Sequence, residues 1–302
     1  MGNSKSGLAA HHMAMLITSI MYAANYSIAK MLMPHAISPY ALVLIRLIGA
    51  SLILFPILWM MKGMRPDWRK DGLLFFWCAM TGVVINMLLF FKGLSLSMAL
   101  DAAIIMTLTP PATYLIAVVS GQDSISARKI GGVLLAFIGV YALITKFTMK
   151  VPEVNMGNLL LLINAVAYAF YIPGVKKLGR TYDPITICAW TFIMGLPVVS
   201  VFGFGDLVAV QWSIFTNAQW AALTFVVMGV TVISYLLISF SSKKLPAASV
   251  AFYSYLQPVI AIAIAIIFYD ERLTLVHLFA GALILFGLWL LNMENKKRNV
   301  YA

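Results

Sequence analysis

Long apolar runs separated by short polar links dominate the sequence. A helix needs about 20 apolar residues to cross the hydrocarbon core of a bilayer, because each residue adds about 1.5 Å. We expect spanning helices over residues 12–32, 39–61, 72–94, 100–120, 128–147, 157–177, 184–204, 217–240, 247–268 and 275–293. The pattern therefore predicts an all-α membrane protein with ten transmembrane helices. The link 205–216 is partly apolar, and we place it in the membrane interface.

The second half of the chain repeats the first. Matching residues recur at a spacing of 148 positions: Pro110 with Pro258, Asp123 with Glu271, and Gly139 with Gly287. Each half has five predicted helices, an odd number, so the second half must start on the opposite face of the membrane. We therefore expect two inverted five-helix repeats, residues 12–147 and 157–293. Carriers that work by alternating access share this architecture, although a duplication kept only for packing is the alternative.

The basic residues give the chain an orientation. With the N-terminus inside, 15 Lys and Arg residues fall on the inner side and 5 on the outer side, while Arg46 lies within a helix. Cytoplasmic loops carry such an excess of positive charge. We expect residues 1–11 and 294–302 to be cytoplasmic tails of a protein in a bacterial inner (plasma) membrane.

Composition supports lipid as the main partner. The chain is 62% hydrophobic and only 10% charged, whereas a soluble domain carries about 25% charged residues. The net charge of +11 would suggest nucleic acid in a soluble protein, but here the basic residues lie in short clusters between apolar runs, so no nucleic-acid partner is expected. Cys78 and Cys188 lie inside apolar runs, without a metal-ligand spacing, so we expect no metal or cofactor.

Two stretches resemble the EamA family of the drug/metabolite transporter superfamily. They read "SLSMALDAAIIMTLTPPATYLIAVVSGQDSIS" and "SKKLPAASVAFYSYLQPVIAIAIAIIFYDERLT", and each is followed by a helix with spaced glycines. The segment "PYALVLIRLIGASLIL" is similar to the family's second helix with its Arg, here Arg46. The resemblance covers residues 12–293 and implies ten helices in two inverted halves, with both termini cytoplasmic. Two positions depart from the pattern: Asp123 stands where Glu is usual, and Lys92 where an uncharged aromatic residue is common.

Arg46 is the clearest candidate for chemistry within the membrane. It lies seven residues into its helix, about 10 Å deep, and a charge there is a functional candidate by default. The planar guanidinium group of Arg46 matches the geometry of a substrate carboxylate or phosphate. The alternative is that Arg46 has a structural role and connects neighbouring helices. Lys30 and Lys92 either reach out to the interface or join Arg46 in a positive outer vestibule, where Asp101 would pair with Lys92.

Polar and aromatic residues near the middle of the spans complete the predicted substrate site. Besides Arg46 and Lys92, we expect it to contain Asn25, Tyr26, Asn86, Tyr168, Tyr171, Trp190, Tyr253 and Gln257. For the amides, helix–helix hydrogen bonding is an equally good explanation. Pro110 and Pro258 are expected to break two symmetry-related helices, and such breaks mark the binding sites of carriers.

All ten acidic residues lie at helix ends or in links. Proton-driven carriers keep ionisable side chains within the membrane as relays, so we expect facilitated diffusion or exchange without a midplane relay. Tyr182-Asp183 and Gly203-Phe204-Gly205-Asp206 look like the signatures of intramembrane aspartyl proteases. Asp183 and Asp206 flank one helix, about 34 Å apart, so they cannot share a proton, and no enzyme is expected.

The sequence thus predicts a secondary transporter, an exporter or facilitator, that moves a small polar organic metabolite by alternating access. An amino acid or a related solute is the leading expectation, and the protein is expected to be a monomer or a homodimer. The alternative is a lipid-handling flippase or a non-catalytic membrane partner protein.

Overall fold

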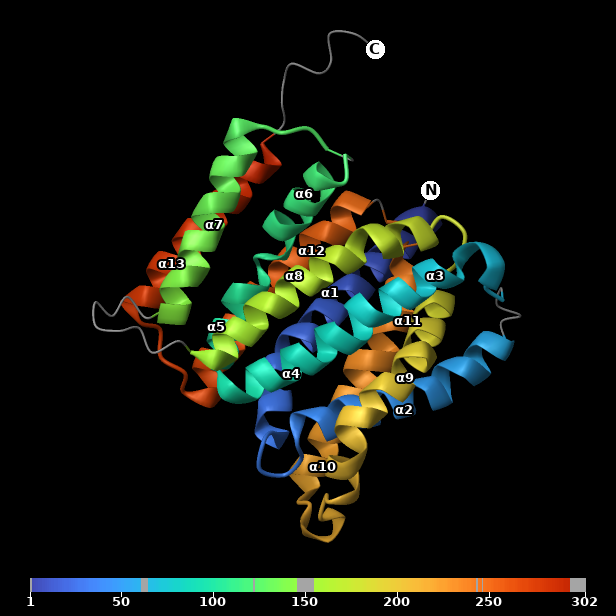
Figure 1. The fold of residues 1–302 in the computed structure, drawn as a ribbon. Coiled ribbons are helices and arrows are strands. Elements are labelled where there is room, and N and C mark those ends of the chain that lie inside the picture. Colours follow the sequence, from blue (N-terminus) through green and yellow to red (C-terminus); the bar gives the residue numbers. More distant parts are fainter. Residues whose placement is uncertain are drawn as a thin grey trace.

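The computed structural model describes residues 2–60, 65–121, 123–145, 155–242, 244–245 and 247–293, and every regular element in these ranges is a helix (Figure 1). The first half comprises α1 (Gly2–Leu32), α2 (Pro39–Met60), α3 (Trp68–Ala79), the π-helix η1 (Met80–Ile85), α4 (Asn86–Leu96), α5 (Ala99–Met106), α6 (Thr109–Val119) and α7 (Ala127–Thr145). The second half comprises α8 (Met156–Leu178), α9 (Pro184–Val208), the 3₁₀-helix η2 (Trp212–Ile214), α10 (Asn217–Thr224), the π-helix η3 (Phe225–Ile233), α11 (Ser234–Ser242), α12 (Ala247–Tyr269) and α13 (Leu275–Asn292).

Several of these elements join into continuous spans. Seven helical stretches of the described chain are long and apolar enough to cross a membrane, and the composites Trp68–Leu96, Ala99–Val119 and Asn217–Ser241 are among them. Two shorter apolar stretches follow, Leu256–Tyr269 and Leu275–Leu291. The prediction of an all-helical membrane protein with about ten helices is confirmed. The largest boundary differences are at α1, which begins at Gly2, inside the expected tail, and at α9, which continues to Val208 in the expected link.

The pair α7 and α13 shows how the two halves are related. A Cβ atom added to Gly132 would lie 2.5 Å from the carbonyl oxygen of Gly287, and one added to Gly139 would lie 2.7 Å from that of Ala280. Residue numbers rise along one helix while they fall along the other, so the helices are antiparallel. Shifting both partners by 148 positions converts one contact into the other. The repeats therefore run in opposite directions through the bundle, and Figure 1 shows this pair side by side at one edge.

The remaining packing follows the same two-fold relation. α2 packs against α9, its own counterpart in the second half. α4 packs against α8, and the equivalent pair, α11 and α1, is also in contact. α1 packs against α12 as α8 packs against α5 and α6. Helices of the core thus contact both repeats, and the interface between the repeats runs through the centre of the bundle.

The bundle has two ends, which we name after their carboxylates. The Asp123 end contains the start of α1, the end of α6 and the end of α13, all at the top of Figure 1. The Glu271 end contains the end of α1 and the start of α5. At the Asp123 end, Asp183 caps α9, and Tyr182 donates a hydrogen bond to Asp71 Oδ2 over 2.8 Å. Burial raises the pKa of the Tyr182 hydroxyl, with a further contribution from the Asp71 carboxylate, so the hydroxyl stays a neutral donor.

The two prolines predicted to break helices behave differently. Residues 107 and 108 form a turn between α5 and α6, and Pro110 lies in the first turn of α6, where its missing N–H leaves no intrahelical bond unmade. Pro258 lies inside α12, which continues through it as one helix. The prediction of a helix break at Pro258 is therefore wrong. The proline removes a single backbone donor there, and the packing of α12 against α1 keeps the helix continuous.

Candidate functional site

Arg46 lies in the interior of the bundle, on α2, and is only 5% exposed. Its Nε donates a hydrogen bond to Thr231 Oγ over 2.9 Å, and its Cζ lies 4.9 Å from the centre of the Phe91 ring. α2 and α4 belong to the first repeat and Thr231 to the second, so the guanidinium joins the repeats. Neither terminal guanidinium nitrogen has a hydrogen-bond partner among the described residues. A buried cation with free donors is suited to an anionic group of a ligand.

The π-helix η3 places Thr231 against Arg46. The Thr231 hydroxyl donates to the carbonyl of Val226, five residues earlier, over 2.9 Å, and Ser234 makes the same type of bond to Gly229 over 3.1 Å. Both bonds follow the wider turn of a π-helix. A second π-helix, η1, occupies the matching span of the first repeat. Short π segments inside α-helices frequently mark functional sites.

Two tyrosines lie near the guanidinium, and others lie beside them. Tyr22 on α1 and Tyr235 on α11 are close enough to interact electrostatically with Arg46, and Tyr168 on α8 with Tyr22. Tyr168 and Tyr171 have ring centroids 5.4 Å apart. Gly82 in η1 makes room for Tyr171, because a Cβ atom there would lie 2.3 Å from its ring. The site therefore combines one cation with aromatic walls.

Two residues of the predicted site and one further amide on α8 each hold a buried polar atom that has no partner in the described part of the chain. They are Asn25 Oδ1, Asn164 Oδ1 and Trp190 Nε1. Asn164 does use its amide nitrogen, which donates to the carbonyl of Asn86 over 2.6 Å. Buried polar groups are normally hydrogen-bonded, since leaving one unpaired costs about 1–3 kcal/mol. Each of these atoms therefore keeps an unused capacity for a hydrogen bond.

Other predicted residues have local partners instead. Lys92 lies over the Tyr40 ring, 5.9 Å from its centre, and Tyr26 makes an edge contact with Phe90 at 5.4 Å. The hydroxyl of Tyr253 lies 3.1 Å from His12 Nδ1. Gln257 is partly buried on α12. Lys92 therefore does not share a contact with Arg46, and the idea of one vestibule containing both is not supported by these contacts.

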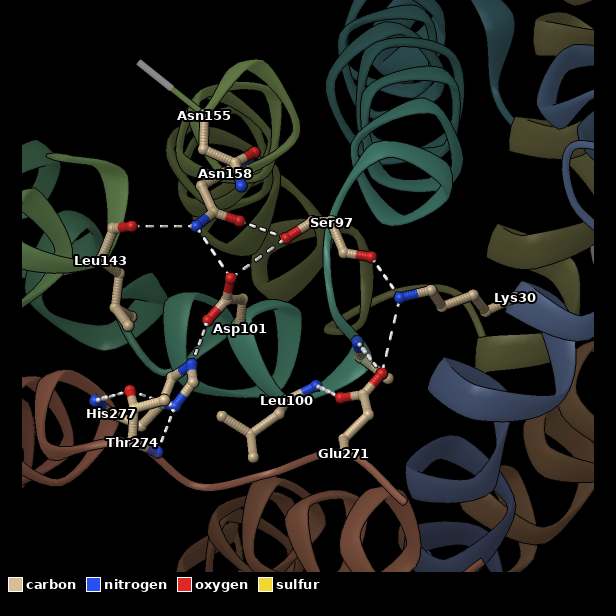
Figure 2. Close-up of polar contacts among 11 residues, drawn as sticks. Lys30, Ser97, Leu100, Asp101, Leu143, Asn155, Asn158, Glu271, Thr274 and His277 are labelled. Atoms are coloured by element: carbon tan, nitrogen blue, oxygen red, sulfur yellow. Dashed lines mark hydrogen bonds and ion pairs between the residues drawn. The ribbon is translucent and has the colours of Figure 1, made fainter. Parts of the chain in front are cut away.

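A second polar cluster lies at the Glu271 end, and Figure 2 shows it. Asp101 Oδ2 accepts a hydrogen bond from Asn158 Nδ2 over 3.0 Å, and Ser97 bonds to Asn158 Oδ1. Asp101 Oδ1 lies 2.9 Å from His277 Nε2. The expected Asp101–Lys92 pair is therefore wrong. Asp101 turns inward because a buried carboxylate needs hydrogen-bond partners, and Asn158 and His277 provide one for each oxygen.

The tautomer of His277 follows from its neighbours. The backbone N–H of Thr274 donates to His277 Nδ1 over 2.9 Å, so Nδ1 acts as an acceptor. The proton is then on Nε2, which donates to Asp101. This bond connects α5 of the first repeat with α13 of the second. His277 also completes the capping box that starts α13.

Comparison with known sequences decides the family. The profile of the EamA-like transporter family matches residues 10–145 and again residues 155–293. The chain is a member of the EamA-like transporter family. It is therefore an integral membrane transporter and not an enzyme.

Relatives of this EamA-like transporter occur in bacteria, in an archaeon and in a plant. The chain is 26% identical over 251 residues to the uncharacterized transporter YyaM of Bacillus subtilis (strain 168), covering 82% of each chain. It is 23% identical over 285 residues to an uncharacterized transporter of Archaeoglobus fulgidus, covering 92% of this chain and 96% of the relative. One solved crystal structure has the same fold, with a TM-score of 0.61 at 16% identity, and the match covers 98% of this chain and 99% of the other.

Sequence reasoning missed several residues of the EamA-like transporter's polar clusters. Thr231 and Phe91 are an ordinary threonine and phenylalanine within apolar runs, and only the three-dimensional packing brings them to Arg46. His277 is not among the predicted site residues, although it lies buried against Asp101. The available signal was the sequence Thr274–His277 at the start of an apolar run, which fits a capping position.

Proposed function

We propose that this EamA-family protein carries a small polar organic solute by alternating access, with Arg46 as the contact for an anionic group. An amino acid or a related carboxylated solute fits this site. The protein is oriented as the positive-inside rule favours, with its Asp123 end in the cytoplasm of a bacterial cell. Facilitated diffusion or exchange is the proposed mode.

The single observation that carries the proposal is the free donor pair of the Arg46 guanidinium at the centre of two inverted repeats. Arg46 is buried, yet the described residues offer it only Thr231 and the Phe91 face. A carboxylate accepts two parallel hydrogen bonds from such a fork. The unpaired oxygens of Asn25 and Asn164 can in turn accept from an ammonium or hydroxyl group.

A lipid-handling function is the second candidate. A groove of about 360 Å³ lies between α2 and α9, and its lining is apolar apart from Ser51; the other residues are Ile48, Leu52, Phe55, Pro56, Ile193 and Leu196. An acyl chain would fit such a lining. The groove has no charged group for a lipid headgroup, so we favour the polar-solute proposal.

Purified protein in sealed vesicles separates these candidates. We expect uptake of a radiolabelled amino acid or other small carboxylated solute that saturates with concentration, without movement of headgroup-labelled phospholipid between leaflets. Movement of the labelled lipid without uptake of any carboxylated solute would overturn the proposal in favour of the lipid-handling function.

A further inference from the structure

The turn that presents Glu271 occurs twice in the chain. At the end of α12, the N–H of Glu271 donates to the carbonyl of Ala265 over 3.2 Å. At the end of α6, the N–H of Asp123 donates to the carbonyl of Ala117 over 3.1 Å. Donors and acceptors are each 148 residues apart. Because the repeats are inverted, this shared turn presents one carboxylate at each end of the bundle.

Glu271 fastens three helices together (Figure 2). Its two carboxylate oxygens accept hydrogen bonds from the first N–H groups of α5, Ala99 over 2.9 Å and Leu100 over 2.8 Å. Lys30 Nζ, from the last turn of α1, lies 3.5 Å from the same carboxylate and donates to the carbonyl of Ser97 over 2.5 Å. A carboxylate at a helix N-terminus is favourable because free N–H groups and the helix dipole meet there. The contact joins the link after α12 in the second repeat to the start of α5 in the first.

The Asp123 end has the matching residue types. α12 starts at Ala247, 148 positions after Ala99, which starts α5. Lys176 lies in the last turn of α8, as Lys30 does in α1, and is exposed. In this structure Asp123 instead lies 2.8 Å from Lys129 and accepts from the N–H of Ser124 over 2.7 Å.

Helix packing also differs between the Glu271 end and the Asp123 end. At the Glu271 end, α12 packs against α5, and Ala103 and Ala261 are buried together with Ala23 of α1. At the Asp123 end, α6 makes no comparable contact with α12 within the described ranges. The two symmetry-related helices thus meet at the Glu271 end and part at the Asp123 end.

We propose that Glu271 and Asp123 are alternating latches of the carrier. In the present state Glu271, with Lys30, holds the Glu271 end closed. In the opposite state the Glu271 contacts open, and the Asp123 carboxylate leaves Lys129 and caps α12 at Ala247, next to Lys176. This inference rests on the proposed function, because only a carrier needs both states.

The two ends of the bundle differ in their hydrogen bonds, and this difference stabilises the present state relative to the opposite one. The Glu271 end has the additional bond between Asp101 and His277. The residues 148 positions away are Ser249 and Lys129, which offer no carboxylate–imidazole pair. The Glu271 end therefore has a carboxylate–imidazole pair that the sequence does not repeat at the Asp123 end.

A cysteine in the central site tests the latches. Tyr168→Cys, in a chain with Cys78→Ala and Cys188→Ala, is labelled in oriented sealed vesicles with a membrane-impermeant maleimide applied from either side. Glu271→Gln and, independently, Lys30→Gln should raise the labelling rate from the Glu271 side relative to the Asp123 side. We expect about a tenfold change, the effect of one charge-assisted hydrogen bond on an equilibrium. Asp123→Asn should move the same ratio in the opposite direction.

Asp270→Asn is the matched control. It removes a neighbouring carboxylate from an exposed residue with φ of 52°, a conformation that Asn tolerates, and should leave the ratio unchanged. A shift of Glu271→Gln and Asp123→Asn in the same direction, or no shift in either, overturns the latch proposal. Uptake of solute by the unmutated protein in the same vesicles tests the carrier function separately, so a carrier without latches is recognised. No labelling from either side in any variant contradicts both proposals.

Discussion

Nε of Arg46 lies 2.9 Å from Oγ of Thr231, and this bond joins α2 of the first repeat to the π-helix of the second. The hydroxyl is held by its own bond to Val226, so it accepts from a fixed position. The bond uses only Nε and leaves the donors of the two terminal nitrogens unused among the described residues.

The first prediction concerns this hydroxyl. Thr231→Ala removes the acceptor and leaves the buried Nε unpaired, which costs about 1–3 kcal/mol. We expect a lower melting temperature and weaker solute uptake. Thr231→Ser keeps the hydroxyl and should retain most of both. Equal losses in the Ala and Ser variants would show that the methyl group, and not the hydrogen bond, is what matters.

The charged residues of the first repeat give the second prediction. Arg46→Ala combined with Lys92→Ala should weaken the uptake of carboxylated solutes more than that of neutral solutes, because the attraction for the anionic group is lost. Because Lys92 lies against Tyr40 and not beside Arg46, the single Arg46→Ala variant should account for most of the effect. Initial rates of radiolabelled uptake measure it. An equal loss for both solute classes would mean that these side chains are structural.

The close approach of α7 and α13 gives the third prediction. A Cβ atom on Gly287 would lie 2.3 Å from the carbonyl oxygen of Gly132, so Gly287→Ala must push the helices apart. Overpacking of this kind costs about 1–3 kcal/mol. Gly281→Ala, in the same helix, meets nothing within 4 Å and should be neutral or slightly stabilising. Thermal unfolding in detergent compares the two, and similar melting temperatures would contradict the described packing.

His277 has two roles that substitution can separate. His277→Gln keeps a side chain suited to the capping box but loses the Asp101 contact, and we expect a loss of about 1.5–3 kcal/mol, typical of a hydrogen bond to a charged group. His277→Ala should lose about 1 kcal/mol more, because the cap is lost too. Thermal unfolding measures both. If His277→Gln melts like the unmutated protein, the Asp101 bond contributes nothing to stability.

Most of the fold could be predicted from the sequence, and much less of the polar chemistry. Apolar length and the 148-residue repeat locate the helices, because lipid demands satisfied backbone groups in every span. The π segments at Met80–Ile85 and Phe225–Ile233 have no comparable sequence signal, since their register depends on packing against neighbouring helices. The prediction of a helix break at Pro258 is wrong for the same reason, because tertiary contacts keep α12 continuous.

The candidate site, like the fold, could be predicted from the sequence only in part. The burial of Arg46 in the bundle interior followed from its depth in an apolar run. The partners of Asp101 did not, because charge matching along the chain favours the nearby Lys92, whereas the structure brings in Asn158 and His277 from other spans. Which polar residues meet depends on helix rotation, and one sequence does not fix that rotation.

Ligand binding to the purified protein tests the central claim, that Arg46 holds a solute between the repeats, most directly. A thermal-shift screen of small carboxylated solutes should find compounds that raise the melting temperature, since a ligand at 100 times its Kd stabilises the folded state by about 2.7 kcal/mol. The account predicts that Arg46→Ala abolishes these shifts and that Arg46→Lys reduces them, each measured against the variant's own unliganded melting temperature. Equal shifts in the unmutated protein and in Arg46→Ala would contradict it.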